Sequence, residues 1–571
     1  MRPLSLLAAL SVLLLNSCYP PGDGKPPPLE ELYFPTGVAL DGLSKSDRDC
    51  TSDKSDCAPR YLYVANSDFD LQYRAASVLS YDLDLLRNLV PRNCTKTDDC
   101  QGDDICDAPG VEGIPTDDPE RVPSYFCVDP VDTKPCGAFG DRDQADVVLN
   151  PGRCQSLDPV HPQDESASVL VDAVGIGAFA TDVIWRTSPD ASPDNPSRLF
   201  VPVRGDSTLH WIDLHDGHFA CGQNGSNDNG CDERHRAGDS TSEADNPDQL
   251  EQPAEPYAID ATAHGDFVAI TNQTTGSVSL YANAWSPNGG PRLVSILGNL
   301  SLSPVAIAAL PEVEVAAGLP PAVGFLVAYR TAPEIDLLRV RDEATDTDTA
   351  LANYTRYALR EAASVPITAN SLNFDSRGIA IDDSERQLDY QACRAAAGAC
   401  APGADPGQCQ NCLRAAHQPE VYVASRAPAS LLVGAMTADL SFSGTNELPS
   451  FTDSVALTAG PSRVILGDVK VPGTRYRDDA GPYDLERRVF VVCFDSRRIF
   501  VYDPKRRLIE AIVNTGRGPY ALAVDRVRGL AYLGHFLDSY LGVISLDQRF
   551  PQTYAAIVAS VGAPKSPRSS K

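Results

Sequence analysis

The amino-acid sequence predicts an all-β protein in which a set of four short antiparallel strands is repeated seven times. Short runs of β-branched and aromatic residues, each bounded by Gly, Asp or Pro, recur along the chain, as expected of strands joined by tight turns. These runs return in a constant order, which is typical of a repeat architecture. The composition, 571 residues with 43% hydrophobic and 7% aromatic side chains, is that of an ordinary globular protein.

The repeated unit is clearest near the C-terminus. Its elements, which we name A, B, C and D, are GPYALAVD at 518–525, LAYL at 530–533, LGVISLD at 541–547 and AAIVASVG at 555–562. The A, B and C elements of six earlier copies lie at 35–41, 61–66 and 77–82; 179–185, 199–203 and 208–213; 256–260, 267–272 and 277–281; 304–308, 323–329 and 335–340; 378–382, 421–425 and 431–435; and 461–466, 489–494 and 499–503.

The first copy carries a recognisable motif. YVAN at 63–66, preceded by PTGVALD at 35–41, resembles the YVTN-type repeat of seven-bladed β-propellers. The resemblance implies a seven-bladed β-propeller of four-stranded antiparallel blades over residues 32–563, with cysteine-rich loop insertions and a flexible tail at 564–571. Six or eight blades remain alternatives because the second and fourth copies are weak. Since the repeats run from an A to a D element, we expect no strand shared between the first and last blades.

The N-terminus predicts export. Arg2 is followed by an apolar run at 4–15, the profile of a signal peptide. LNSC at 15–18 resembles the lipobox of bacterial lipoproteins, which implies a signal peptide at 1–17, cleavage before Cys18 and acylation of Cys18. An ordinary secretory signal followed by a structural cysteine is the alternative.

The lipobox resemblance also implies a location. Two or three acyl chains on Cys18 would hold the protein at a membrane. Residues 18–31, rich in proline, would act as a semi-rigid tether. No later segment offers eighteen uninterrupted apolar residues, so the remainder is expected outside the cytoplasm in the bacterial cell envelope, at the outer membrane on its periplasmic or surface face.

Fourteen of the sixteen cysteines form four groups with even numbers. The groups are Cys50 and Cys57; Cys94, Cys100, Cys106, Cys127, Cys136 and Cys154; Cys221 and Cys231; and Cys393, Cys400, Cys409 and Cys412. In an exported protein this parity predicts local disulfides within loop insertions at about 42–60, 92–157, 217–252 and 383–418. Connectivity within the larger groups stays open, and a zinc site in the last group is the alternative. Cys493 lies in an apolar run and is predicted to be a buried free thiol.

Propeller geometry predicts that most insertions share one rim with a set of cations. In such a blade the A-to-B and C-to-D turns lie on one rim, and three of the four cysteine groups fall in those turns. The same turns or their flanks hold Arg487, Arg488, Lys505, Arg506, Arg507, Arg526 and Arg528. These residues are either solvated hairpin tips or a docking patch for an anionic surface group, glycan or acidic partner.

No motif for catalysis is present. The sequence lacks a Gly-x-Ser-x-Gly elbow, a phosphate loop, a dinucleotide fingerprint and His-Glu-x-x-His. We therefore assign no catalytic residue, no metal site and no cofactor. Calcium near Asp68 and Asp70, or near Asp346 and Asp348, stays a weaker alternative. His210, His215 and His218 are expected to be surface and turn residues, because strand alternation does not aim all three the same way.

These observations favour a noncatalytic binding or scaffold module anchored to a membrane. The net charge of −29 argues against nucleic acid as a partner. An envelope protein or glycan is expected instead. The alternative function is a propeller hydrolase or oxidoreductase, lactonase-like or quinone-dependent, with a metal at the channel mouth.

Overall fold

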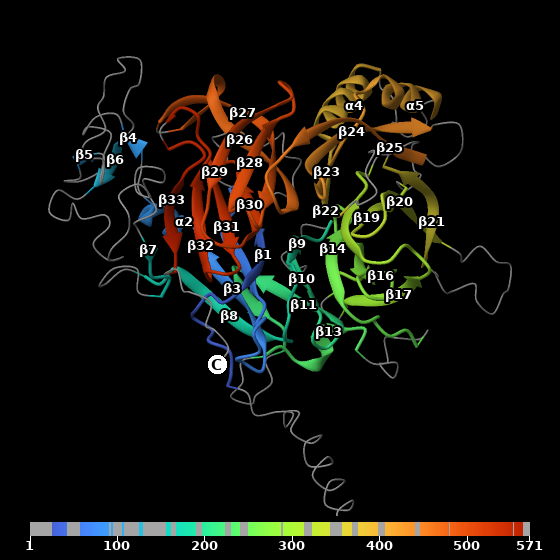
Figure 1. The fold of residues 1–571 in the computed structure, drawn as a ribbon, viewed down its shortest axis with the longest axis horizontal. Helices are drawn as coiled ribbons and strands as arrows, with labels where there is room; N and C mark the ends of the chain where they lie inside the picture. The colour runs from blue at the N-terminus through green and yellow to red at the C-terminus, as the bar shows by residue number, and fades with distance from the viewer. Residues whose placement is uncertain are drawn as a thin grey trace, which may run out of the picture.

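The protein is a ring of seven four-stranded antiparallel blades (Figure 1), seen in a computed structural model. The structure describes residues 25–42, 58–90, 93–94, 105–107, 125–128, 156–160, 167–189, 197–222, 230–239, 249–286, 289–312, 322–342, 357–367, 375–397, 406–439, 446–478, 480–551 and 553–562. The predicted fold, a seven-bladed β-propeller, is therefore confirmed. The A strand of each blade lies innermost and the D strand outermost.

The blades follow one another along the chain. Blade 1 contains β1 (Pro35–Leu40), β2 (Tyr61–Asn66), β3 (Ala76–Asp82) and β8 (Leu170–Ile176); blade 2 contains β9 (Ile184–Arg186), β10 (Ser197–Val203), β11 (Thr208–His215) and β12 (His218–Ala220); blade 3 contains β14 (Pro256–Ala261), β15 (Phe267–Asn272), β16 (Ser277–Asn283) and β17 (Pro291–Leu297). Blade 4 contains β18 (Pro304–Ala309), β19 (Gly324–Tyr329), β20 (Glu334–Asp342) and β21 (Tyr357–Pro366).

The last three blades have the same strand order. Blade 5 contains β22 (Ser376–Asp382), β23 (Glu420–Arg426), β24 (Ala429–Asp439) and β25 (Asn446–Ala456); blade 6 contains β26 (Pro461–Asp478), β27 (Gly481–Cys493), β28 (Arg498–Asp503) and β29 (Leu508–Asn514); blade 7 contains β30 (Pro519–Asp525), β31 (Leu530–His535), β32 (Tyr540–Ser545) and β33 (Ile557–Val561). B strands such as β2 and β31 are buried along their whole length, which explains their continuous apolar sequence.

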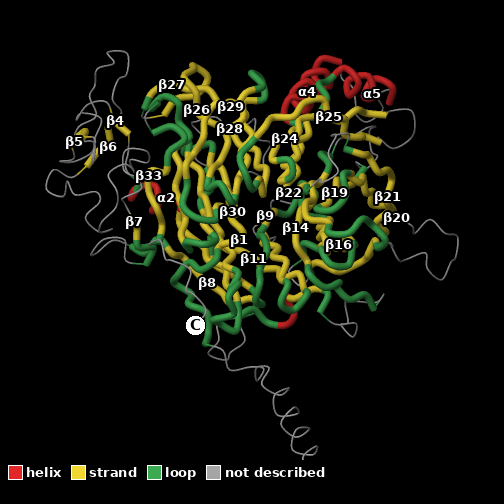
Figure 2. Tube along the Cα trace, in the orientation of Figure 1, coloured by secondary structure: helices red, strands yellow, loops and turns green. Residues whose placement is uncertain are grey.

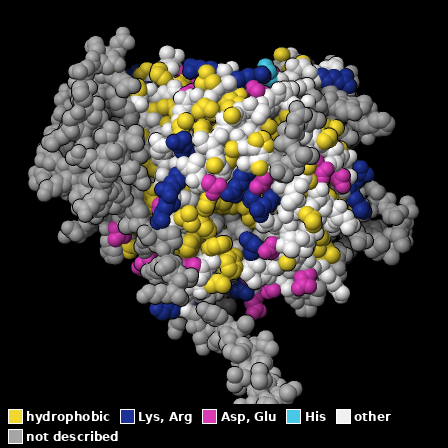
Figure 3. Space-filling model, in the orientation of Figure 1, with side chains coloured by type: hydrophobic (Ala, Val, Ile, Leu, Met, Phe, Trp, Pro, Cys, Tyr) yellow, Lys and Arg dark blue, Asp and Glu magenta, His cyan; other side chains and the backbone are white. Residues whose placement is uncertain are grey.

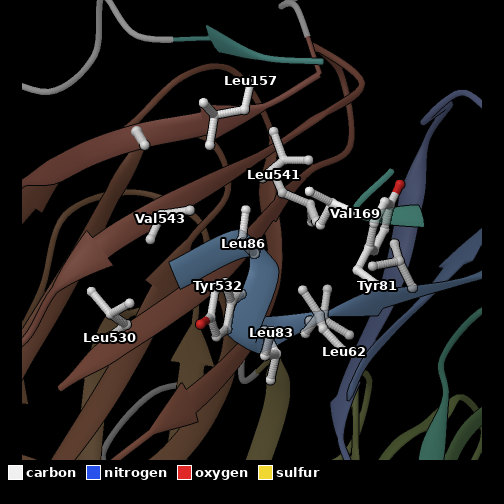
Figure 4. Close-up of a cluster of buried hydrophobic side chains, with 14 of the residues drawn as sticks. Leu62, Tyr81, Leu83, Leu86, Leu157, Val169, Leu530, Tyr532, Leu541 and Val543 are labelled. Atoms are coloured by element: carbon white, nitrogen blue, oxygen red, sulfur yellow. The ribbon is translucent and has the colours of Figure 1, made fainter. Parts of the chain in front are cut away.

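The seam between blades 1 and 7 is closed by side-chain packing. Helix α2 (Leu83–Leu89) follows β3 and places Leu83 and Leu86 against Tyr532 and Leu541 of blade 7 (Figure 4). All four side chains are almost completely buried. Burial of side chains of this size contributes about 1.5–3 kcal/mol each, so this cluster joins the two ends of the ring.

Blade 7 differs in one respect from the expectation that the first and last blades share no strand. A two-residue strand, β7 (Ser156–Leu157), comes from the insertion in blade 1 and pairs in parallel with β33. Blade 7 therefore has a fifth strand contributed by blade 1, although its four regular strands all come from the C-terminal repeat. The outer edge of β33 would otherwise carry unpaired backbone groups, and β7 covers a part of it.

Most insertions lie on one side of the ring, which we name the insertion rim and define by the A-to-B and C-to-D turns. Helices α4 (Ser384–Ala397) and α5 (Pro406–Ala415) fill the A-to-B turn of blade 5, and the long β26–β27 hairpin extends blade 6 on the same side (Figure 2). A small sheet of β4 (Asn93–Cys94), β6 (Tyr125–Val128) and β5 (Ile105–Asp107) belongs to the C-to-D insertion of blade 1. None of the helices in the described ranges is long and apolar enough to cross a membrane.

Two disulfides join cysteines within their predicted groups. Cys393 on α4 bonds Cys412 on α5. Cys221 bonds Cys231 in blade 2, where the outer strand is split into β12 and β13 (Arg236–Ala237), with a 3-10 turn, η4 (Glu233–His235), before β13. The side chains of the remaining predicted disulfide cysteines lie outside the described residues.

Removing the Cys221–Cys231 disulfide should destabilise blade 2. The bond closes a ten-residue separation, and both cysteines are buried in the core between blades 1 and 2. Cross-links over loops of this size contribute about 2–3 kcal/mol. We expect Cys221→Ala combined with Cys231→Ala to lower the free energy of unfolding in urea by about that amount, and a reductant to have little further effect at this site. A double variant as stable as the parent protein would contradict this role.

Candidate functional site

The A strands begin, on the side opposite the insertion rim, with a backbone conformation that is repeated from blade to blade. In five blades the strand starts with proline, and the preceding residue has a positive φ: Phe34 (47°), Glu255 (58°), Ser303 (60°), Gly460 (84°) and Gly518 (64°). The pairing register then shifts within the next two or three residues, as in a β-bulge. Bulges re-aim side chains, and here they set which side chains enter the central channel.

One position of the A strand distinguishes two blades from the other five. The register aligns Gly37, Asp182, Ala258, Ala306, Gly378, Arg463 and Ala521. A side chain at Gly37 has no room, because a Cβ atom there would lie 2.5 Å from the backbone nitrogen of Val183. Small residues thus occupy this narrow level in five blades, whereas blades 2 and 6 contribute Asp182 and Arg463.

Asp182 and Arg463 form an ion pair across the channel. Arg463 Nη1 lies 2.7 Å from Asp182 Oδ2, although the two blades are not neighbours in the ring. Arg463 Nη2 also donates to the carbonyl oxygens of Thr181, at 3.3 Å, and Thr36, at 3.5 Å. Burial raises the pKa of Asp182, with Arg463 opposing the rise. Burial disfavours the Arg463 cation, but Asp182 and Tyr520 outweigh it and raise the pKa of Arg463.

A pair of tyrosines forms a second crossing of the channel. Tyr257 of blade 3 and Tyr520 of blade 7 occupy the position directly after the A-strand proline, and their hydroxyl oxygens are 3.2 Å apart. The Tyr520 ring also lies 4.5 Å from the Arg463 guanidinium carbon, in cation–π contact. Tyr520, together with burial, raises the pKa of Tyr257, which is therefore neutral at physiological pH. In both crossings, polar side chains from non-neighbouring blades bond one another across the channel.

Six aromatic side chains gather on this side of the channel, and one of them, Tyr520, also belongs to the second crossing. We name them the aromatic collar: Phe34, Phe69, Phe179, Phe494, Tyr520 and Phe536. Phe69 is central, since its ring centroid lies 5.3 Å from that of Phe536, 6.1 Å from Phe179 and 6.2 Å from Phe34. The residues come from B-to-C turns, from segments that enter A strands and from β30, so this side of the ring is the collar rim.

The collar rim carries exposed apolar side chains, one of which belongs to the collar itself. The side chain of Phe69 is 55% exposed and that of Leu71, in the same turn, is 57% exposed. Leu302, in the link between blades 3 and 4 on the same rim, is 64% exposed. Aromatic contacts of this kind stabilise a cluster by about 0.5–1.5 kcal/mol per pair beyond burial. The collar is therefore a preassembled aromatic surface rather than a set of isolated side chains.

Two collar residues occupy a strained backbone conformation. Phe34 and Phe179 have φ values of 47° and 61°, in the left-handed region that a bulky residue rarely adopts. Blades 6 and 7 use Gly460 and Gly518 before the same strand position, where glycine adopts this conformation without a side-chain penalty. Retaining phenylalanine costs of order 1–3 kcal/mol at each site. Because Glu255 and Ser303 adopt the same conformation in blades 3 and 4, it belongs to the entry of the A strand, and it fixes the direction in which the Phe34 and Phe179 side chains leave the backbone.

The B-to-C turn of blade 1 is held to both neighbouring segments of the collar. Ser67 N donates to Phe34 O at 3.1 Å, and Phe179 N donates to Ser67 O at 2.6 Å. Asp68 is buried and accepts from Tyr73 N at 3.2 Å, and burial raises its pKa to about 7. These bonds fix the backbone on either side of Phe69.

Of the two suggested calcium positions, only the one at Asp68 and Asp70 lies among the described residues. The carboxylate of Asp70 accepts hydrogen bonds from the backbone and side chain of Gln72. Among the described residues, no group of three or more His, Cys, Asp or Glu side chains could hold a metal. Asp346 and Asp348 lie outside the described residues.

Five cations of the predicted docking patch are ion-paired, and four of these, all but Arg506 beside Asp503, have buried or half-buried side chains. Arg488 is 1% exposed and pairs with Glu486, Asp503 and Glu510. Arg487 pairs with Asp382 and Asp468, and Arg526 with Asp468; Arg528 pairs with Asp84 and Asp525. These side chains join structural elements to one another and do not form an open cationic surface.

Three members of the patch are exposed. Lys505, Arg506 and Arg507 occupy the C-to-D turn of blade 6, where Asp503 accepts hydrogen bonds from the backbone of Lys505 and Arg506. On the face that Figure 3 shows, cationic side chains are separated by hydrophobic and acidic ones. Of the predicted docking patch for an anionic partner, only this turn is exposed.

Two other sequence-based expectations concern single residues. Cys493 is buried and not disulfide-bonded, and burial raises the pKa of its thiol to about 12. The expectation for His210 is wrong, because its side chain is fully buried and its Nε2 lies 3.0 Å from Asp206 Oδ2. His215 and His218 do flank the turn between β11 and β12.

The collar was missed by the sequence reading. A weak signal exists, because Phe494 and Phe536 each follow directly the last residue of a B strand, and Phe69 lies three residues after one. Phe34 likewise directly precedes an A-strand proline. Only ring closure shows that these positions meet.

No family model and no curated protein matches the chain. Solved structures that resemble it include a putative 6-phosphogluconolactonase from Bacteroides uniformis (9% identity, 85% of this chain and 86% of that chain covered, TM-score 0.39). A protein from Lactobacillus plantarum (10% identity, 85% and 86% covered, TM-score 0.39) and a putative 6-phosphogluconolactonase from Bacteroides fragilis (9% identity, 85% of both covered, TM-score 0.35) are also similar. At these TM-scores the similarity carries no argument about function.

Proposed function

We propose that this chain is a noncatalytic binding module, anchored in the bacterial cell envelope through acyl chains on Cys18, which contacts its partner through the aromatic collar. The observation that carries the proposal is the collar itself. Six rings from four blades converge on one rim, and Phe69 is more than half exposed at their centre. Exposed aromatic side chains on a rigid support are typical of binding surfaces.

The channel beneath the collar supports a noncatalytic role. A catalytic pocket needs polar groups that are available to the substrate. Here Arg463 is engaged by Asp182, and the Tyr257 and Tyr520 hydroxyl groups are engaged with each other. The strongest charges in the channel are thus already paired, and the collar presents a preformed apolar surface above them.

Site-specific photocrosslinking tests the binding surface. A photoreactive phenylalanine analogue at position 69 should form adducts in intact envelopes, whereas the same analogue at Leu508 should not. Leu508 is a matched control because it is 44% exposed and lies on the insertion rim. Adducts from both positions, or from neither, would contradict a partner surface at the collar.

The anchor and the absence of catalysis need separate measurements. Mass spectrometry of the N-terminal peptide should show acyl chains on Cys18, and Cys18→Ala should release the protein from membranes. A metal analysis combined with a lactonase assay tests the enzymatic alternative. Stoichiometric channel-bound calcium accompanied by turnover would overturn the noncatalytic assignment.

A further inference from the structure

We infer that the collar rim faces the lipid bilayer and that the surface around Phe69, Leu71 and Leu302 lies against the membrane interface. The inference rests on the proposed function, because it uses the anchor at Cys18 and names the partner of the collar. It is supported by the point at which the chain enters the propeller, by the apolar residues on this rim and by the pairing of its charges.

The first described residues lie on the collar rim. Lys25 forms a parallel β-bridge with Tyr73, and Arg74 N donates to Lys25 O at 3.1 Å, so the chain enters beside the B-to-C turn that carries Phe69 and Leu71. The Tyr33 ring then contacts Tyr73, with centroids 5.2 Å apart. The tether is thus fixed to the collar rim and not to the insertion rim.

The remaining tether is short. Cys18 and Lys25 are seven positions apart in the sequence, and an extended chain spans at most about 3.6 Å per residue. The entry point can therefore lie no further than roughly 25 Å from the acylated residue. A tether of this length keeps the rim on which it ends close to the bilayer, while the insertion rim, on the opposite end of the strands, faces away.

The apolar residues of the rim suit a membrane interface. Phe69, Leu71 and Leu302 are three of the six large hydrophobic side chains that are strongly exposed among the described residues. Phenylalanine and leucine on one face of a rigid support enter the boundary between head groups and acyl chains. They extend from B-to-C turns and a link between blades, so insertion requires no unfolding of a blade.

Some of the carboxylates on the collar rim are paired with arginines. The pairs are Arg204–Glu255, Arg377–Asp375, Arg426–Asp495 and Arg517–Asp538. Arg330, Arg497 and Arg498 on the same rim are exposed. Basic side chains are attracted to an anionic lipid surface. These pairs and exposed arginines reduce the repulsion between the rim and anionic head groups, although the whole chain carries a net charge of −29.

Tryptophan fluorescence in vesicles tests the inference. The acylated full chain carrying Phe69→Trp or Leu302→Trp is reconstituted into vesicles of phosphatidylethanolamine and phosphatidylglycerol with brominated acyl chains. The emission added by either tryptophan should shift to the blue and be quenched. Leu508→Trp, on the insertion rim, should show neither change. Two reporters on the rim keep the test valid if one substitution disturbs folding.

The possible outcomes separate the two proposals. If the protein sediments with the vesicles but neither rim tryptophan is quenched, the orientation is wrong and the anchor stands. If acylated protein is absent or does not sediment, both the anchor and the orientation fail. Quenching at Leu508→Trp, or adducts from position 69 only to another protein and none to phospholipid, would also overturn the orientation.

Discussion

Replacing Arg198 with alanine is expected to lower the free energy of unfolding by about 3–5 kcal/mol, because it leaves a buried carboxylate without its partner. The Arg198 side chain is completely buried on β10, and its Nε lies 2.7 Å from Asp213 Oδ1. Its two terminal nitrogens donate to Asn283 and to the carbonyl oxygens of Ala284 and Gly289 in blade 3. One guanidinium thus connects two neighbouring blades.

Aromatic contacts add to this role of Arg198. The guanidinium carbon lies 4.2 Å from the ring centre of Trp211 and 5.1 Å from that of Trp285. Cation–π contacts that are shielded from water are worth about 2 kcal/mol. Arg198→Lys should therefore recover only a part of the stability, since an ammonium group cannot stack between two rings and bond several acceptors at once.

Urea denaturation measures the effect against a matched control. Arg330→Ala removes an exposed arginine from a B-to-C turn, and it should change the free energy of unfolding by less than about 0.5 kcal/mol. An Arg198→Ala protein that loses less than about 1 kcal/mol would show that water reaches Asp213 in the variant and replaces the lost partner.

The fold could be predicted because each blade carries a local signal. Strands such as β2 and β31 are buried on both faces, so their sequences are continuous short apolar runs that can be recognised individually. The long β26–β27 hairpin was missed beyond 461–466 and 489–494, because its polar extension lacks such a run. β9 is shorter than expected, and beside it Val183 N donates to the side chain of Asp182.

The candidate site could not be predicted in the same way. Phe69 and Phe536 come from opposite ends of the chain, and their contact depends on the closure of the ring. The prediction of a cationic docking patch from the positions of Arg and Lys in the sequence failed for a related reason. Arg488 was read as a surface cation, yet Glu510, 22 residues further along the chain, pairs with it within blade 6. Sequence patterns identify strands, but partners on other strands and other blades are set by tertiary packing.

Removing Arg463 from the channel should destabilise the protein in a pH-dependent manner. Arg463→Met leaves Asp182 without its cationic partner in the channel, at an expected cost of about 3 kcal/mol near neutral pH. The side chain of Asp182 is only 14% exposed, so water cannot fully replace the guanidinium. Urea denaturation at several pH values measures the cost, with the parent protein as the reference.

The sign of the pH dependence follows from the pKa of Asp182. Burial already raises this pKa in the folded protein, and loss of Arg463 raises it further. A carboxyl group with a raised folded pKa contributes stability below its unfolded pKa, and this stability is lost as the pH rises through the folded pKa. The loss in free energy of unfolding caused by Arg463→Met should therefore be largest at neutral pH and become smaller as the pH falls toward about 4.

A second variant separates the unpaired charge from simple loss of packing. In Arg463→Met combined with Asp182→Leu, both charges are removed, and the double variant should recover most of the stability at neutral pH because no buried ion remains unpaired. The stability that the double variant still lacks relative to the parent protein should not change with pH, unlike that of the single variant. A double variant as unstable as Arg463→Met, with no change between neutral pH and about 4, would mean that Arg463 acts through its contact with Tyr520 and not through Asp182.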